Sequence, residues 1–162
     1  MTVGIAPSSA AIIAGSAAAV TIENFSHTPT ETGTFTNTYT QTRANSGSVI
    51  SEAIADTVFI SNSHELLAAT LSQSKVQGDG NNYSCLAQTQ VAAIGDFDID
   101  AAETFSFHFP TVLDLLTSVN NRQSERSSAR GSISFGLINT VTNIRLDSFQ
   151  LASSLDYSVV FI

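Results

Sequence analysis

Several residue types on which many binding and catalytic proteins depend are scarce in this chain. Tryptophan is absent, cysteine occurs once, at Cys85, and lysine occurs once, at Lys75. A single cysteine excludes a disulfide bond within the chain. Six lysines and arginines stand against fourteen acids, which gives a net charge of -8. Nucleic acids and anionic membrane surfaces require clustered positive charge, so we expect neither as a partner.

Charge of either sign is also sparse, at 12% of residues, whereas 43% of residues are hydrophobic. A chain of 162 residues with this composition can bury a core without disulfide bonds, and one domain is expected. Its abundant threonine, valine, isoleucine and phenylalanine favour strands. A surface that is rich in hydroxyl groups and poor in lysine suggests a secreted protein of the cell surface.

Alternation with a period of two residues dominates the chain and predicts strands. In 34–42, "TFTNTYTQT", the threonines share one face and two aromatic residues share the other; 83–99, 103–109 and 133–137 alternate in the same way. A change of parity near Asp147 and Ser148 predicts a β-bulge. Frequent turn signals, at 45–48, 78–82 and 120–131, separate these runs. The pattern predicts an all-β fold, a β-sandwich of jelly-roll type.

Two segments fit either a helix or a strand. In 62–71, Asn62 and Glu65 have the spacing of a helix cap, and 111–119 places apolar residues at helical spacing.

The N-terminal stretch carries no charged side chain before Glu23. Residues 3–22 are long enough to span a bilayer, but their small residues and Pro7 argue against a membrane anchor. The run from Ala17 to Ala19 is similar to a signal-peptide cleavage site, although no basic residues precede the apolar stretch. We therefore expect residues 1–19 to form an extended arm, or the remnant of a signal, ahead of a single sandwich domain over 20–162.

Three alternating acids, Asp96, Asp98 and Asp100, would lie on one side of a strand. Calcium takes six to eight oxygen ligands, so this row predicts part of a calcium site. The EF-hand pattern does not fit, because Ala101 occupies the position of its turn glycine. An acidic, solvated strand end is the competing interpretation.

No motif for an enzyme reaction is present. The sequence contains no G-x-S-x-G, no S-x-x-K and no glycine-rich phosphate loop, and its three histidines lack the spacing of a zinc site. Cys85 shares its strand face with Ala87 and Val91, which predicts a buried small residue. We therefore expect a protein that is not an enzyme.

Two long segments carry a resemblance to a known class. The stretch "VQGDGNNYSCLAQTQVAAIGDFDIDAAETFSFHF" and the later "LLTSVNNRQSERSSARGSISFGLINTVTNIRLDSFQL" resemble secreted cyanobacterial β-rich proteins, of the kind that often carries a PEP-CTERM surface-sorting tail. The matching features are strand patterns, and the sorting tail itself is absent from the sequence. The resemblance implies an exported, non-enzymatic protein of the cell surface or biofilm matrix.

Both ends of the chain are apolar, and this suggests a mode of assembly. Stable monomers protect the edges of their sheets with charge or proline, whereas subunits that assemble by strand addition use an extended end to complete a neighbour's sheet. We predict a self-assembling structural subunit of a fibre or surface matrix. The residues expected at the contacts are Val3, Ile5, Ala11, Ile13, Tyr157, Val159 and Phe161.

The competing hypothesis is a calcium-assisted carbohydrate-binding module, in which polysaccharide is the partner. Sandwich folds commonly have this function, but the absence of tryptophan, the favoured sugar platform, counts against it.

Overall fold

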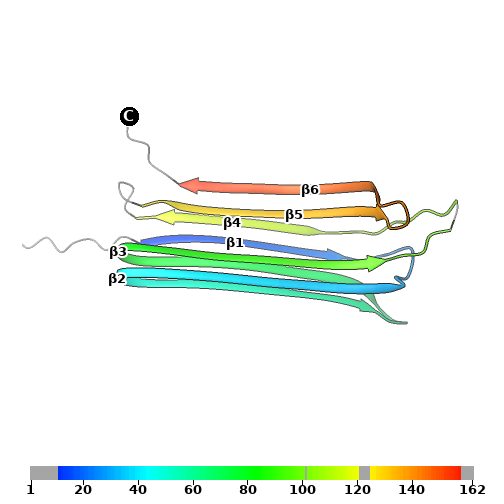
Figure 1. The fold of residues 1–162 in the computed structure, drawn as a ribbon, viewed down its shortest axis with the longest axis horizontal. Helices are drawn as coiled ribbons and strands as arrows, with labels where there is room; N and C mark the ends of the chain where they lie inside the picture. The colour runs from blue at the N-terminus through cyan, green and yellow to red at the C-terminus, as the bar shows by residue number, and fades with distance from the viewer. Residues whose placement is uncertain (1–10, 101, 121–124, 158–162) are drawn as a thin grey trace, which may run out of the picture.

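The protein is all-β and its strands are antiparallel, as the alternation predicted. The structure is a computed structural model that describes residues 11–100, 102–120 and 125–157, without the side chains of Asn81 and Asn82. Six strands follow one another along the described chain (Figure 1). They are β1 (Ala11–Ile22), β2 (Glu31–Ser61), β3 (Leu66–Asp96), β4 (Thr111–Val119), β5 (Ser127–Asn139) and β6 (Ile144–Tyr157).

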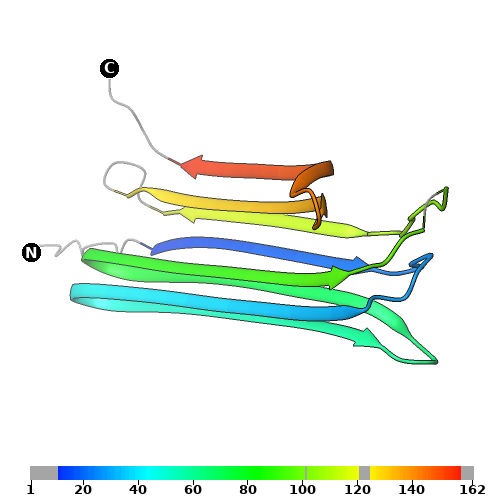
Figure 2. The ribbon, with the colours of Figure 1, turned by 45° about the vertical axis from the view of Figure 1, so that its right-hand side comes forward.

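The strands β2 and β3 form one long hairpin that folds back on itself (Figure 2). The hairpin bends back where Gly47 pairs with Gly80, whose φ angles are 106° and 119°. A side chain at either glycine would collide with the backbone of the other, so this crossing needs two glycines. The turns predicted at 45–48 and 78–82 are therefore one shared corner, inside paired strands, and do not separate strands.

The corner divides the hairpin into a lower part (48–61 with 66–79) and an upper part (31–44 with 83–96), which we call the lower and upper hairpins. The lower hairpin continues through β1 to β4 and completes a four-stranded sheet. The upper hairpin returns over the inner face of this sheet. The Thr57 hydroxyl donates to the Ala92 carbonyl, and the hydroxyls of Ser72 and Thr89 share a hydrogen bond.

The strand β1 overturns the predicted boundary between an arm and a domain at residue 19. It runs without interruption from Ala11 to Ile22, between β3 and β4, and is paired with both. A run of alanines, glycine and serine can form a central strand because both of its backbone edges are paired and its small side chains contact those of the neighbouring strands. Residues 11–19 are therefore part of the domain.

The strands β5 and β6 form a second sheet on the same side as the upper hairpin. β5 packs over β1 and β4, and β6 packs over β4. β6 has one extra residue, Leu146, opposite the step from Leu137 to Ile138, which confirms the predicted bulge next to Asp147. The two layers give a sandwich whose second layer consists of the upper hairpin and the β5–β6 sheet.

A cluster of phenylalanines in mutual contact closes one end of the sandwich. Phe25 contacts Phe97 and Phe107 at ring-centroid distances of 5.5 and 6.1 Å, and Phe107 contacts Phe135 at 4.8 Å. The segment 103–109 keeps its predicted alternation, with the phenylalanines half-buried, but it forms only one isolated bridge, between His108 and Glu23, and no strand. We call this the phenylalanine end, and the opposite end, with Gly47 and Gly80, the bend end.

Residues 62–71 and 111–119, for which the sequence left helix and strand open, form no helix. The side-chain oxygen of Asn62 accepts hydrogen bonds from the backbone N–H groups of His64 and Glu65, so this cap-like pattern closes the tip of the lower hairpin and starts no helix. Residues 111–119 form β4, and Ser127 already begins β5 within the predicted turn 120–131.

Candidate functional site

A long groove separates the upper hairpin from β5. Its larger part, about 990 Å³, lies at the bend end between 85–90 of β3 and 128–132 of β5. A smaller part, about 400 Å³, continues between 89–93 and 132–136 toward the phenylalanine end. Both parts contact Ala18, Ser72, Thr89, Gln90 and Ser132, so they form one continuous groove.

The two walls of the groove are strands with one unpaired edge. Residues 83–96 pair with β2 on one edge, and β5 pairs with β6; no described strand pairs with the other edge of either. The two walls run in the same direction, because increasing residue numbers in β3 meet increasing numbers in β5 (Figure 1). The first layer has the same arrangement around β1, whose neighbours 66–79 and β4 also run parallel to each other. The groove is therefore the second-layer counterpart of the position that β1 fills.

The bottom of the groove consists of small side chains at its bend end. Strand register places Ala14, Ser16 and Ala18 of β1 on the inner face, beside Val76, Ser74 and Ser72 of β3. In the same rows, β4 contributes Leu113 and Leu115, which lie beneath β5. At the bend end, the inner face thus carries leucines of β4 beneath β5 and small side chains of β1 and β3 beneath the groove.

The bottom changes character toward the phenylalanine end. There the groove is lined by larger apolar side chains: Val20, Ile22, Phe109, Ile133, Phe135 and Phe149. Only Lys75 and Arg130 bring a charge to the lining, and no acidic residue belongs to it. The lining therefore suits a segment without charged side chains.

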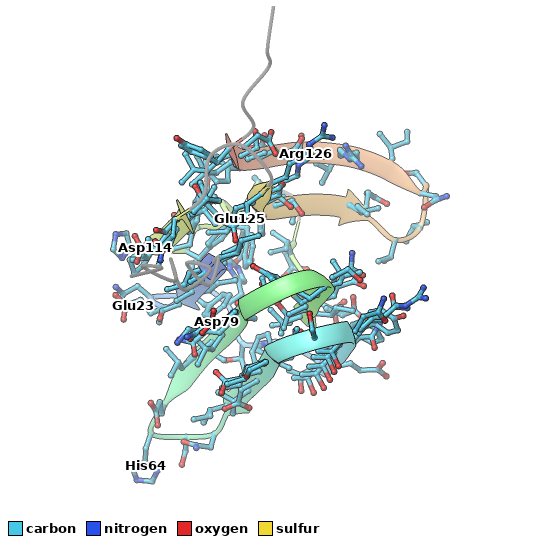
Figure 3. All side chains as sticks on the ribbon, turned by 90° about the vertical axis from the view of Figure 1, so that its left-hand side faces the viewer. Glu23, His64, Asp79, Asp114, Glu125 and Arg126 are labelled. Carbon is cyan, nitrogen blue, oxygen red and sulfur yellow. The ribbon has the colours of Figure 1, made fainter. Side chains whose placement is uncertain are left out.

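Cys85 lies in the wall of the groove at the bend end, where it is half-buried and not fully buried as the sequence predicted. It is a free thiol, and burial raises its pKa. Nearby, the Tyr83 hydroxyl donates to Glu125 Oε1 at 3.2 Å. Burial, and next the negative charge of Glu125, raise the pKa of Tyr83, so its hydroxyl stays protonated and remains a donor. Figure 3 shows Glu125 between the hairpin corner and the β5–β6 ribbon.

The predicted assembly residues fall into two groups. Val3, Ile5, Val159 and Phe161 lie outside the described residues. Ala11 and Ile13 lie in β1 and Tyr157 ends β6, and all three are paired within their own chain, so the structure corrects the prediction that Ala11 and Ile13 extend to a neighbour.

The three acids predicted to bind calcium do not converge in the structure. Asp96 ends β3, whereas Asp98 and Asp100 follow it in an exposed, irregular segment. Across the described part of the chain, no three histidine, cysteine or acidic side chains gather as a metal ion would require. The calcium site and the carbohydrate function that depends on it stay untested predictions.

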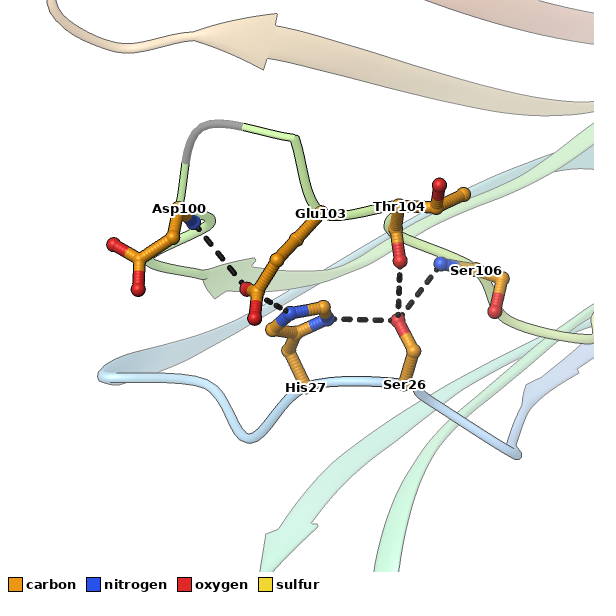
Figure 4. Close-up of polar contacts among 6 residues, drawn as sticks. All are labelled: Ser26, His27, Asp100, Glu103, Thr104 and Ser106. Atoms are coloured by element: carbon orange, nitrogen blue, oxygen red, sulfur yellow. Dashed lines mark hydrogen bonds and ion pairs between the residues drawn. The ribbon is translucent and has the colours of Figure 1, made fainter.

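One polar chain brings together a serine, a histidine and an acid, which sequence reasoning missed (Figure 4). Ser26 Oγ lies 2.8 Å from His27 Nδ1, and His27 Nε2 lies 3.0 Å from Glu103 Oε2. The hydrogen bond from the His27 ring, and next the one from the Asp100 N–H, hold the pKa of Glu103 below its ordinary value. The order of groups matches that of a hydrolytic triad.

The contacts of Ser26 nevertheless fit a structural junction better than a nucleophile. Ser26 Oγ accepts the Ser106 N–H at 2.9 Å and also approaches the Thr104 carbonyl at 3.4 Å, so its lone pairs and proton are engaged in joining two extended segments. The Ser26 N–H donates to the Ser106 carbonyl at 2.8 Å in the same junction. Neither part of the groove includes these residues.

Comparisons with protein-family models, with curated proteins and with solved structures find no match for this chain. Within the described residues, no helix has the length and hydrophobicity needed to cross a membrane.

Proposed function

We propose that the protein is an extracellular structural subunit that assembles with copies of itself by strand addition, into a fibre or surface matrix. The groove between β3 and β5 is the acceptor. The single observation that carries the proposal is that both walls of the groove are strands with an unpaired edge, above a bottom of small side chains.

Exposed strand edges are templates for pairing with another chain, and soluble proteins usually protect them with charge, proline or a cover. The wall at 85–93 contains no charged residue and no proline, and β5 brings only Arg130 to the groove. An added strand would satisfy backbone donors and acceptors on both sides at once, and its alternate side chains would fill the space above the small residues. These features support an acceptor for a backbone better than a site for a small ligand.

The first test blocks the groove. Ser74 lies on the inner face at the bottom of the groove, and Gln73 lies next to it on the exposed outer face of the same sheet. We expect wild-type protein to form fibres in negative-stain electron microscopy and large species in light scattering. Ser74→Leu should reduce assembly at least tenfold, because the added side chain occupies the space for an incoming strand, whereas Gln73→Leu should assemble as wild type does.

Urea unfolding controls for damage to the fold, and we expect both variants to lie within about 1 kcal/mol of wild type. Wild-type protein that stays monomeric at high concentration would contradict the proposed function. Assembly of Ser74→Leu at the wild-type level would show that another surface joins the subunits.

A further inference from the structure

The groove also specifies which segment enters it and in which direction. We propose, on the basis of the function proposed above, that the groove takes residues 2–10 of a second copy of this chain, lying parallel to β3 and β5, so that the bend end of one subunit meets the phenylalanine end of the next.

The length and charge of this segment fit the groove. The walls at 85–93 and 128–136 accept a strand of about nine residues, roughly 30 Å long. Residues 2–10, "TVGIAPSSA", directly precede β1 and have the same reach when extended. They carry no charged side chain, which suits a lining without acids and with only two basic residues.

A second copy can provide this segment in full, whereas the same chain cannot. β1 already begins at Ala11 in the first layer, at the bend end. To reach its own groove, the chain would have to cross between layers about 10 Å apart and reverse, which uses about three residues. Those residues would be lost from the segment, and part of the groove would stay open.

The direction follows from the sizes of the side chains. The larger apolar residues of the segment, Val3 and Ile5, are near its start, and small residues, Ser8 to Ala10, are at its end. The larger part of the groove, about 990 Å³ above small residues, lies at the bend end, and the smaller part, about 400 Å³ among phenylalanines, lies at the other end. Large side chains meet small ones at both ends only when the segment runs from the bend end toward the phenylalanine end.

The direction also decides what kind of assembly forms. A parallel segment leaves the acceptor at its phenylalanine end and continues into β1 of the donor, which starts at the donor's bend end. This contact joins two different surfaces, so it can repeat without limit. An antiparallel segment would leave the acceptor at its bend end and join two identical surfaces, which closes into a dimer. Only the parallel direction gives a fibre.

Cys85 provides a direct test, because this native thiol marks the bend end of the groove. Neighbouring strands hold Cα atoms at distances that a disulfide bond can bridge. A cysteine at the start of the segment, in Thr2→Cys or Val3→Cys, should reach Cys85 of the next subunit if the segment is parallel. A cysteine near its end, in Ser8→Cys or Ser9→Cys, should reach Cys85 only if the segment is antiparallel. Ser158→Cys probes the C-terminal segment as donor.

We expect a ladder of covalent multimers on non-reducing gels from Thr2→Cys and Val3→Cys after mild copper-phenanthroline oxidation of the assembled full-length protein. Cys85→Ala in each background should abolish the ladder. Cross-linking by Ser8→Cys or Ser9→Cys, limited to dimers, would overturn the direction, and cross-linking by Ser158→Cys would overturn the choice of donor. Fibres that show no cross-link to Cys85 would overturn this inference but leave the proposed function standing, whereas an absence of any assembly would overturn the function itself.

Discussion

Two equivalent positions in this sandwich differ in whether a strand fills them. In the first layer, β1 lies between two strands that run parallel to each other and is paired with both along its length. In the second layer, 83–93 and β5 flank the groove in the same relative direction, and no described strand lies between them. The strand β3 borders both positions because it folds back at Gly80.

The inner-face residues beneath the groove differ in size from those beneath β5. Under β5, Leu113 and Leu115 fill the inner face, while under the groove the same rows contain alanine and serine. Space left unfilled above small side chains forfeits dispersion contacts. This difference motivates the proposal of a donor strand, whose side chains would lie above these small residues.

The largest expected effect is the difference in stability between a proline placed in β1 and a proline placed in the proposed donor segment. Ala17→Pro, in the middle of β1, removes a backbone donor from a strand that is paired on both sides, so we expect a loss of about 3 kcal/mol or more in the free energy of unfolding. Ala6→Pro, in the proposed donor segment, should leave the stability of the subunit within about 0.5 kcal/mol of wild type and weaken assembly. Urea unfolding and electron microscopy measure the two effects.

Equal destabilisation by the two proline substitutions would contradict the comparison, because it would place residue 6 in the fold of its own subunit.

The sequence predicted the strands well because alternation depends only on neighbouring residues. The half-buried phenylalanines of 103–109 and the inward Ile133 and Phe135 lie where the pattern put them. The same locality explains what failed. "NSGS" and "GDGNN" each have the composition of a turn, but only pairing between distant residues shows that they form one corner of a continuous hairpin.

The groove could not be predicted for a related reason. The small residues of β1 are an apolar stretch in the sequence, and they suggested an arm or a signal remnant. Their place at the bottom of a groove depends on the register of three strands and on the absence of a fourth among the described residues. The apolar ends did suggest strand addition, but the groove that contains Ser74 and Cys85 became visible only in the fold.

A pair of glycines in β5 gives an effect of intermediate size. A methyl group at Gly131 would overlap Leu113 Cδ1 and press on Ser16 and Leu115, whereas one at Gly136 would meet nothing within 4 Å. We expect Gly131→Ala to lower the free energy of unfolding by about 1–3 kcal/mol through overpacking, and Gly136→Ala to leave it unchanged or raise it slightly. Urea unfolding of both variants measures the difference.

Gly131 faces the first layer, whereas Gly136 lies on the exposed face of β5. Equal effects at the two glycines would therefore mean that the space beneath β5 is no more tightly packed than its exposed face, which would contradict a filled inner face under β5.

The smallest expected effect concerns the junction that holds the chain beyond the filled strand. β1 continues into the segment with Ser26 and His27, which Glu103 anchors at 3.0 Å. The folded-state pKa of Glu103 is lowered, first by the hydrogen bond from His27, so the stabilisation is fully present above the ordinary carboxyl value of about 4.3 and is lost as the pH falls through the lower folded value. Amide hydrogen exchange should therefore show that residues 23–30 lose protection in this acid range before β1 does.

The control variant Glu103→Gln removes the titrating group. In this variant, the protection of residues 23–30 relative to β1 should stay constant across the same pH range. An unchanged pH dependence would show that other groups control the junction.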